Sequence, residues 1–287
     1  MKKLSQIIVL IGLFATTISF SSCSSTDKST NEENTTASSS TPAEQPWNLT
    51  VYLDLSDRIT REMVPSQPEY DSIAINEVFS QFLNHLIKGK KIAVAKDCFR
   101  IIVEPTPQLT KINDMVGSLN IDLSTALPPE KKKILNKTRE VFPSTISQIY
   151  DKTLEEKNWV GCDIWGFFSD KRMVDKLCIR PGYRNIIVVI TDGYLFDTNH
   201  KKKEGNAYSY VTHEVLKANP KMSLICRRDG LQDLEVLMLC VNPFNKNEGE
   251  LLTHILDNWF NAMEVGKVEI YTNGTNTPQY INSFFNE

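Results

Sequence analysis

The chain has 287 residues and a formal net charge of −3, with 41% hydrophobic and 23% charged residues. Acidic and basic residues are nearly balanced and no basic block occurs, which argues against a protein that binds nucleic acid through phosphate contacts. The six cysteines match no zinc-binding spacing, so a structural zinc site is excluded as well.

Residues 1–22 have the pattern of a signal peptide. Two lysines precede an uncharged apolar run, and small residues follow it directly before Cys23. The run is too short for a comfortable membrane span, although an uncleaved anchor helix is the alternative. Small residues before a Cys resemble a bacterial lipobox. The resemblance implies cleavage before Cys23, its lipidation with acyl chains such as palmitate, and a lipid anchor in the bacterial cell envelope, with the outer membrane favoured because no Asp follows Cys23.

The segment after the lipidated Cys, residues 23–46, consists almost entirely of Ser, Thr, Asn, Glu and Pro. It cannot bury enough apolar surface to offset its chain entropy, so we expect a disordered tether. Residues 47–287 then form one folded body with a single large core. Without the two N-terminal lysines the formal charge of −3 becomes −5, which leaves the exported part mildly acidic.

The body alternates apolar runs that end in polar turns with segments whose apolar residues recur every three or four positions. The runs predict strands at residues 49–53, 99–103, 119–123 at a sheet edge, 186–190, 234–241 and 268–271. The periodic segments predict helices at residues 71–86, 129–156 with Pro143 breaking or kinking the helix, 163–177 with Asp163 as N-cap, 208–217, 249–263 and 277–285. This order predicts an α/β doubly wound fold, with a mostly parallel central sheet and helices on both faces.

Two of the predicted buried strands end in polar motifs. Asp54-Leu-Ser56-Asp57-Arg58 follows the first strand, and Thr191-Asp192-Gly193 follows the strand at residues 186–190. Ligands of open parallel sheets bind beyond the carboxyl ends of the strands, where the strand order reverses. If the two strands are neighbours there, their carboxylates face one cavity. Paired carboxylates with a nearby hydroxyl suit hard cations such as magnesium, manganese or calcium.

With Gly161-Cys162-Asp163, these motifs resemble the three parts of the metal-ion-dependent adhesion site of von Willebrand factor type A (vWA) domains. The family pattern is Asp-x-Ser-x-Ser after the first strand, a Thr in a loop, and an Asp in Thr-Asp-Gly after a later strand. The resemblance covers about residues 49–272 and implies a vWA/Rossmann-like fold. It also implies a binding rim formed by Asp54, Ser56, Asp57, Arg58, Cys162, Asp163, Thr191 and Asp192. An ion there would be held by Asp54, Ser56 and Asp192.

Two departures from the family pattern change the expected chemistry. Arg58 and Cys162 stand where the family has hydroxyl ligands of the ion. A thiol is a poor ligand for a hard ion, and a guanidinium repels a dication. We therefore expect a degenerate site without a cofactor, in which Arg58 takes the place of the ion by pairing with Asp54 or Asp192. Bound magnesium or manganese is the alternative.

The sequence favours a non-enzymatic role in adhesion or as a scaffold. The expected partner is an envelope or extracellular protein, with the membrane contacted only through the lipid anchor. No Gly-x-Ser-x-Gly elbow surrounds Ser56, and the four histidines give no dyad spacing with Cys162. The alternative is a metal-dependent hydrolase that uses the carboxylates of Asp54, Asp57 and Asp192. A lipoprotein that binds a small molecule in a deep apolar pocket is a third class.

Overall fold

The computed structural model describes residues 45–89, 92–157, 161–169, 171–194, 203–204, 207–208, 230–243 and 246–286. The expected signal peptide, Cys23 and nearly all of the expected tether lie outside these ranges. So does the helix expected at residues 208–217, apart from its first residue. None of the helices within these ranges is long and apolar enough to cross a membrane.

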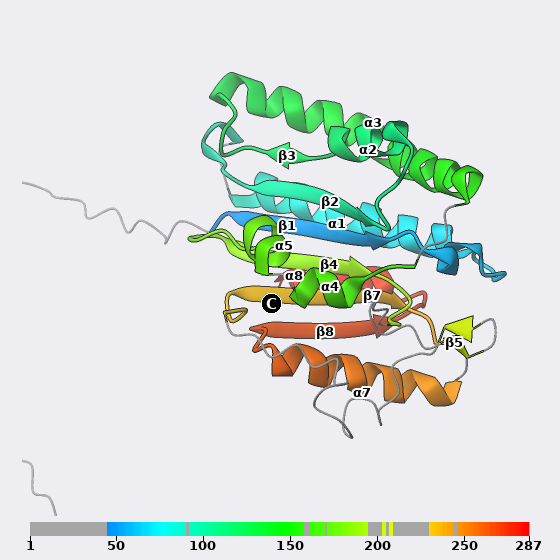
Figure 1. Cartoon of the computed structure of the whole chain (residues 1–287). Helices are drawn as coiled ribbons and strands as arrows, with labels where there is room; N and C mark the ends of the chain where they lie inside the picture. The colour runs from blue at the N-terminus through cyan, green and yellow to red at the C-terminus, as the bar shows by residue number, and fades with distance from the viewer. Residues whose placement is uncertain are drawn as a thin grey trace, which may run out of the picture. The chain divides into compact units, whose positions relative to one another are not determined.

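A six-stranded sheet with the order β3-β2-β1-β4-β7-β8 forms the centre of the body (Figure 1). Every neighbouring pair is parallel except β2 and β3. The mostly parallel sheet expected from the sequence is therefore confirmed. The strands are β1 (Trp47–Asp54), β2 (Cys98–Glu104), β3 (Ile121–Asp122), β4 (Arg184–Ile190), β7 (Leu234–Val241) and β8 (Lys267–Thr272). Two short strands, β5 (Lys203–Glu204) and β6 (Ala207–Tyr208), pair separately.

The α-helices are α1 (Gln67–Gly89), α2 (Thr110–Ser118), α3 (Pro128–Glu156), α4 (Ile164–Ser169), α5 (Lys171–Leu177), α7 (Lys246–Ala262) and α8 (Thr277–Asn286). The described residues also include two short 3-10 helices, η1 (Asp57–Thr60) and η2 (Ile92–Val94). Of the two outcomes expected at Pro143, a break or a kink, the break is wrong, because α3 continues through it. Pro143 is exposed, so water can satisfy the carbonyl that the missing N–H leaves unpaired.

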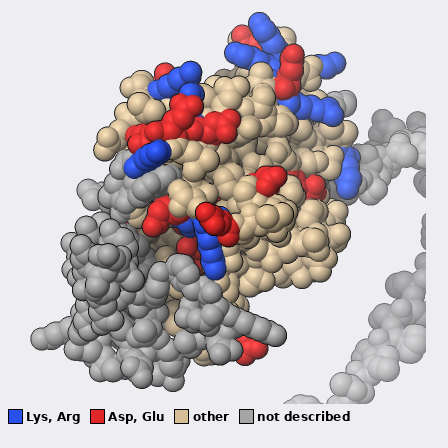
Figure 2. Space-filling view, turned by 90° about the vertical axis from the view of Figure 1, so that its right-hand side faces the viewer, with Lys and Arg blue, Asp and Glu red and all other residues tan. Residues whose placement is uncertain are grey.

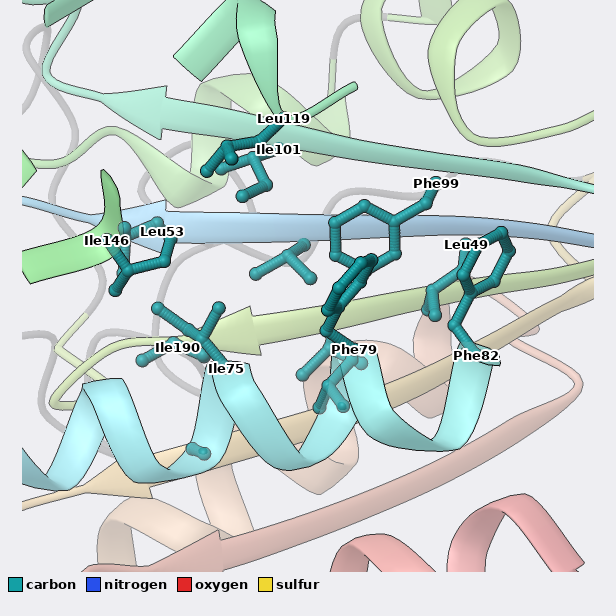
Figure 3. Close-up of a cluster of buried hydrophobic side chains, with 14 of the residues drawn as sticks. Leu49, Leu53, Ile75, Phe79, Phe82, Phe99, Ile101, Leu119, Ile146 and Ile190 are labelled. Carbon is teal, nitrogen blue, oxygen red and sulfur yellow. The ribbon is translucent and has the colours of Figure 1, made fainter. Parts of the chain in front are cut away.

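Side chains of the strands alternate between two buried clusters, as the period of a strand requires. Leu49 and Leu53 of β1 join a cluster with residues of α1, α2, α3 and α8. Tyr52 of the same strand joins a second cluster with residues of α4, α5 and α7. Figure 3 shows Phe79 and Phe82 of α1 turned toward β2 in the first cluster. Every residue of β1 is buried, and because both sides of the strand are covered, Val51, Tyr52 and Leu53 follow one another as apolar residues instead of alternating with polar ones.

The carboxyl ends of β1 and β4 meet at one end of the sheet. Leu53 is paired with Ile190, so Asp54 and Thr191 follow from neighbouring strand ends. The strand order also reverses here, since the chain adds β2 on one side of β1 and β4 on the other. The two strands that carry the polar motifs are thus neighbours, as the sequence analysis required for a shared site.

Candidate functional site

Asp54, at the end of β1, is buried and its carboxylate is engaged by neighbouring groups. Oδ1 accepts a hydrogen bond of 2.9 Å from the backbone N–H of Ser56. Oδ2 accepts one of 2.8 Å from Oγ1 of Thr191 and lies 3.3 Å from Nε of Arg58. The two polar motifs that are distant in the sequence are therefore joined directly through this carboxylate.

Arg58 is buried in η1 and lies beneath the strand ends. Its Nε donates to the backbone oxygen of Asp54 at 2.8 Å, and Nη2 donates to that of Ile190 at 3.3 Å. The expected pairing of Arg58 with Asp54 is thus present. The bidentate contact, however, goes to a residue that the sequence analysis did not identify: Nη1 and Nη2 donate to the two oxygens of Asp71 in α1, at 3.3 and 2.7 Å.

Asp71 is fully buried and gathers donors from several elements. Besides Arg58, Nε2 of Gln67 donates to it at 2.9 Å and Oη of Tyr150 in α3 at 2.8 Å. Oε1 of Gln67 in turn accepts from the side-chain amides of Asn242 and Asn273, which follow β7 and β8. A single polar network therefore ties α1 and α3 to the carboxyl ends of the sheet.

The pKa shifts agree with a tightly held ion pair. Burial alone would lower the pKa of Arg58, but Asp71 and Asp54 raise it well above its ordinary value. Burial and the charge of Asp71 raise the pKa of Tyr150 well above its ordinary value, so its hydroxyl stays protonated and keeps donating. A signal for Asp71 was present in the sequence, since it precedes Ile75 by four residues on the apolar stripe of α1.

The Thr191-Asp192-Gly193 motif forms a tight turn after β4. Oγ1 of Thr191 accepts from the N–H of Gly193, and Oδ1 of Asp192 accepts from the N–H of Tyr194, both at 3.2 Å. Gly193 has a φ of +91°, which glycine adopts without strain. Burial and the nearby charge of Asp54 raise the pKa of Asp192 to about 7, although Arg58 opposes the rise. Asp192 therefore keeps its proton to a higher pH than a solvent-exposed carboxyl group does.

Cys162 and Asp163 turn to different neighbours. Sγ of the buried Cys162 lies 3.3 Å from Oη of Tyr52 in β1. Burial and then Asp54 raise the pKa of its thiol well above the ordinary value, so the thiolate needed of a nucleophile is scarce. Asp163 caps α4, as expected, because its Oδ1 accepts from the N–H of Gly166 at 2.7 Å. A Cβ on Gly166 would come within 2.5 Å of that carboxylate, so the cap requires glycine there.

The end of the sheet also carries acids with raised pKa values. Asp57 is exposed to solvent on one side. The protein around its carboxylate nevertheless displaces part of the surrounding water, and this effect, followed by the charge of Asp54, raises the pKa of Asp57. Burial raises that of Glu104 at the end of β2, and Asp163 and Asp54 add to the rise. Glu104 was not among the residues expected from the sequence. We call Asp54, Asp57, Glu104, Asp163 and Asp192 the acidic rim. Figure 2 looks onto this end of the body, where acidic and basic side chains are scattered over a mostly uncharged surface.

Among the residues that the structure describes, no three His, Cys, Asp or Glu side chains are grouped so that they could hold a metal ion. Ser56 and Thr191 lie next to Asp54, but the thiol of Cys162 contacts Tyr52. Comparison with models of protein families and with curated proteins finds no match for this chain.

Asp71→Ala should lower the free energy of unfolding by about 3–5 kcal/mol, because Arg58 would stay buried without its main carboxylate partner. Urea denaturation followed by circular dichroism measures the loss. The matched control is Glu155→Ala, which removes the exposed ion pair with Lys152 on α3 and should cost at most about 0.5 kcal/mol. Equal effects of the two substitutions would contradict the central role of the buried pair.

Asp192→Asn should stabilise the protein more at pH 8 than at pH 5. The pKa of Asp192 is raised from 3.8 to about 7, so the folded chain binds this proton more tightly than the unfolded chain. Its contribution to stability is present at low pH and is lost as the pH rises through about 7. We expect the gain from the substitution to differ by at least about 1 kcal/mol between the two pH values. Asp114→Asn on the exposed face of α2 is the control and should give no such difference.

Proposed function

We propose that residues 47–287 form a vWA-like, non-enzymatic protein-binding domain on a lipid-anchored protein of the bacterial cell envelope, in an adhesion or scaffold role. The doubly wound arrangement is part of the proposal. Its support is the reversal of strand order at β1 and the packing of helices against both sets of strand side chains. The outer membrane is the favoured location, through acyl chains on Cys23.

The observation that carries the proposal is the engagement of Asp54. Its two oxygens already accept from Ser56 and Thr191, and Arg58 lies against one of them. A cation of the protein itself thus lies beside the carboxylate that would have to hold an ion. This donor set does not fit magnesium or manganese well, because a dication would face the guanidinium at close range. We therefore propose a site that works without a cofactor.

The acidic rim indicates which partner chemistry suits the site. The raised pKa values of Asp57, Glu104 and Asp192 mean that these carboxylates are destabilised by burial and by each other. A Lys or Arg side chain of a partner protein would relieve that repulsion. The rim also lies at the far end of β1 from Trp47, where the chain enters the body, about 26 Å along an eight-residue strand.

Affinity purification of the tagged full-length chain from envelope extracts should recover a partner protein. The combination of Asp57→Ala and Asp192→Asn should reduce that recovery at least about tenfold, which corresponds to about 1.4 kcal/mol of binding free energy. Glu140→Ala, at an exposed position of α3 that is part of neither the rim nor the polar network, is the control and should leave recovery unchanged. Recovery of no protein, or of a protein insensitive to the rim substitutions, would refute the proposed function.

The alternative is a metal-dependent hydrolase that uses Asp54, Asp57 and Asp192, and it predicts tight ion binding. We expect millimolar magnesium or manganese to leave the Tm of the protein unchanged. Metal analysis of protein purified without chelator should find less than one equivalent. A Tm that rises with either ion, together with loss of the rise in Asp192→Ala, would favour the hydrolase.

A further inference from the structure

A groove borders the acidic rim on the side of α1 and α3. It lies between the segment after η1, the first turns of α1 and the second half of α3, and it has a volume of about 910 Å³. Ile59 and Thr60 of η1 line it, so the groove begins two residues beyond Asp57 of the rim. Its apolar lining includes Ile59, Met63, Pro65, Ile73, Pro143 and Leu154.

Apolar side chains at the edge of this groove are exposed. Val64, between two lining residues, is 99% exposed and Ile73 is 49% exposed. Single exposed apolar residues are ordinary, but apolar residues gathered around a hollow with a polar rim are typical of a binding site. In Figure 1 the segment after β1 extends beyond the strand ends, where an incoming chain would meet it first.

The polar part of the lining is acidic. Glu62, Glu69 and Asp151 are exposed carboxylates around the groove. The hydroxyl and N–H of Ser66 both donate to Glu69 at 2.7 Å, and these bonds lower the pKa of Glu69. The lining includes one cation, Arg61, whose guanidinium donates to the backbone oxygens that follow β7. The groove therefore combines an apolar floor with an excess of negative charge.

We propose that this groove binds an apolar segment of a partner protein that is flanked by Lys or Arg. The inference rests on the proposed protein-binding function. Charge complementarity supports this occupant over two others. The chain's own residues 23–46 contain four acidic residues and one Lys, and they join the body at the opposite end of β1. A second copy of the acidic body would likewise bring net negative charge to a negative groove.

The floor of the groove is held rigid from within. Tyr150 lines it and donates to Asp71, the carboxylate that also receives Arg58. A preformed surface costs less ordering on binding than a mobile one. A partner segment could contact the groove with its apolar residues and reach the adjacent rim with a basic residue.

Fluorescence anisotropy with the detergent-solubilised full-length chain tests the proposal. The probes are three labelled peptides of equal length: one alternates Leu with Lys, one replaces each Lys by Glu, and one replaces each Leu by Ser. The Leu/Lys peptide should bind at least about tenfold more tightly than either other peptide. Ile73→Ser and Asp151→Lys should each weaken it at least about fivefold. Ile87→Ser on α1 and Glu140→Lys on α3 are exposed controls and should leave its affinity unchanged.

Similar affinities for the three peptides, no binding, or equal losses with the controls would overturn the proposal. A dimer in sedimentation analysis that Ile73→Ser dissociates would identify a second copy as the occupant and would also overturn it. Failure of the groove proposal can be distinguished from failure of the proposed protein-binding function of the rim. If Ile73→Ser leaves recovery of the partner intact while the rim substitutions abolish it, only the groove inference fails.

Discussion

The buried pair of Arg58 and Asp71 is the interaction on which this end of the molecule depends. Neither charge can be buried alone without a large penalty, so η1 and α1 have to fold against each other. Asp71 also receives Gln67 and Tyr150, and Arg58 reaches the backbone oxygens at the ends of β1 and β4. The network thereby fixes the start of α1 and the last turns of α3 relative to the strand ends.

The direction of the Arg58 side chain explains the charge of the surface above it. Because its guanidinium is shared between Asp71 and Asp54, it compensates Asp192 only partly, and the pKa of Asp192 remains raised to about 7. A cation that points inward therefore stabilises the fold while leaving the rim acidic. Arg58 thus supports the fold below the strand ends, and it leaves the negative charge of the carboxylates above them only partly compensated.

Much of the fold followed from local patterns, whereas the partners inside the site did not. The apolar run at residues 234–241 has the same bounds as β7, and the strands before Asp54 and Asp192 are neighbours as required. Asp71 lies on the helix face that carries the apolar residues of α1, and this position alone predicts a buried acid. Its partners, Arg58 of η1 and Tyr150 of α3, become clear only in the folded structure, where these two elements pack against α1. Glu104 ends a strand that carries no motif. The break expected at Pro143 is absent from α3, and the exposure of Pro143 is a tertiary property that the local pattern does not show.

The two departures from the proposed family pattern are physically connected. An ion of charge +2 would be replaced here by a guanidinium of charge +1 that is already shared with Asp71. Without an ion, no hydroxyl ligand would be needed at position 58 or at position 162. This agrees with Cys162, whose thiol is buried against Tyr52. Burial, together with the charges of neighbouring carboxylates, raises the pKa values of Asp57, Glu104 and Asp192. In the proposed domain, a basic residue of the partner would supply in the complex the charge that the ion supplies in the family.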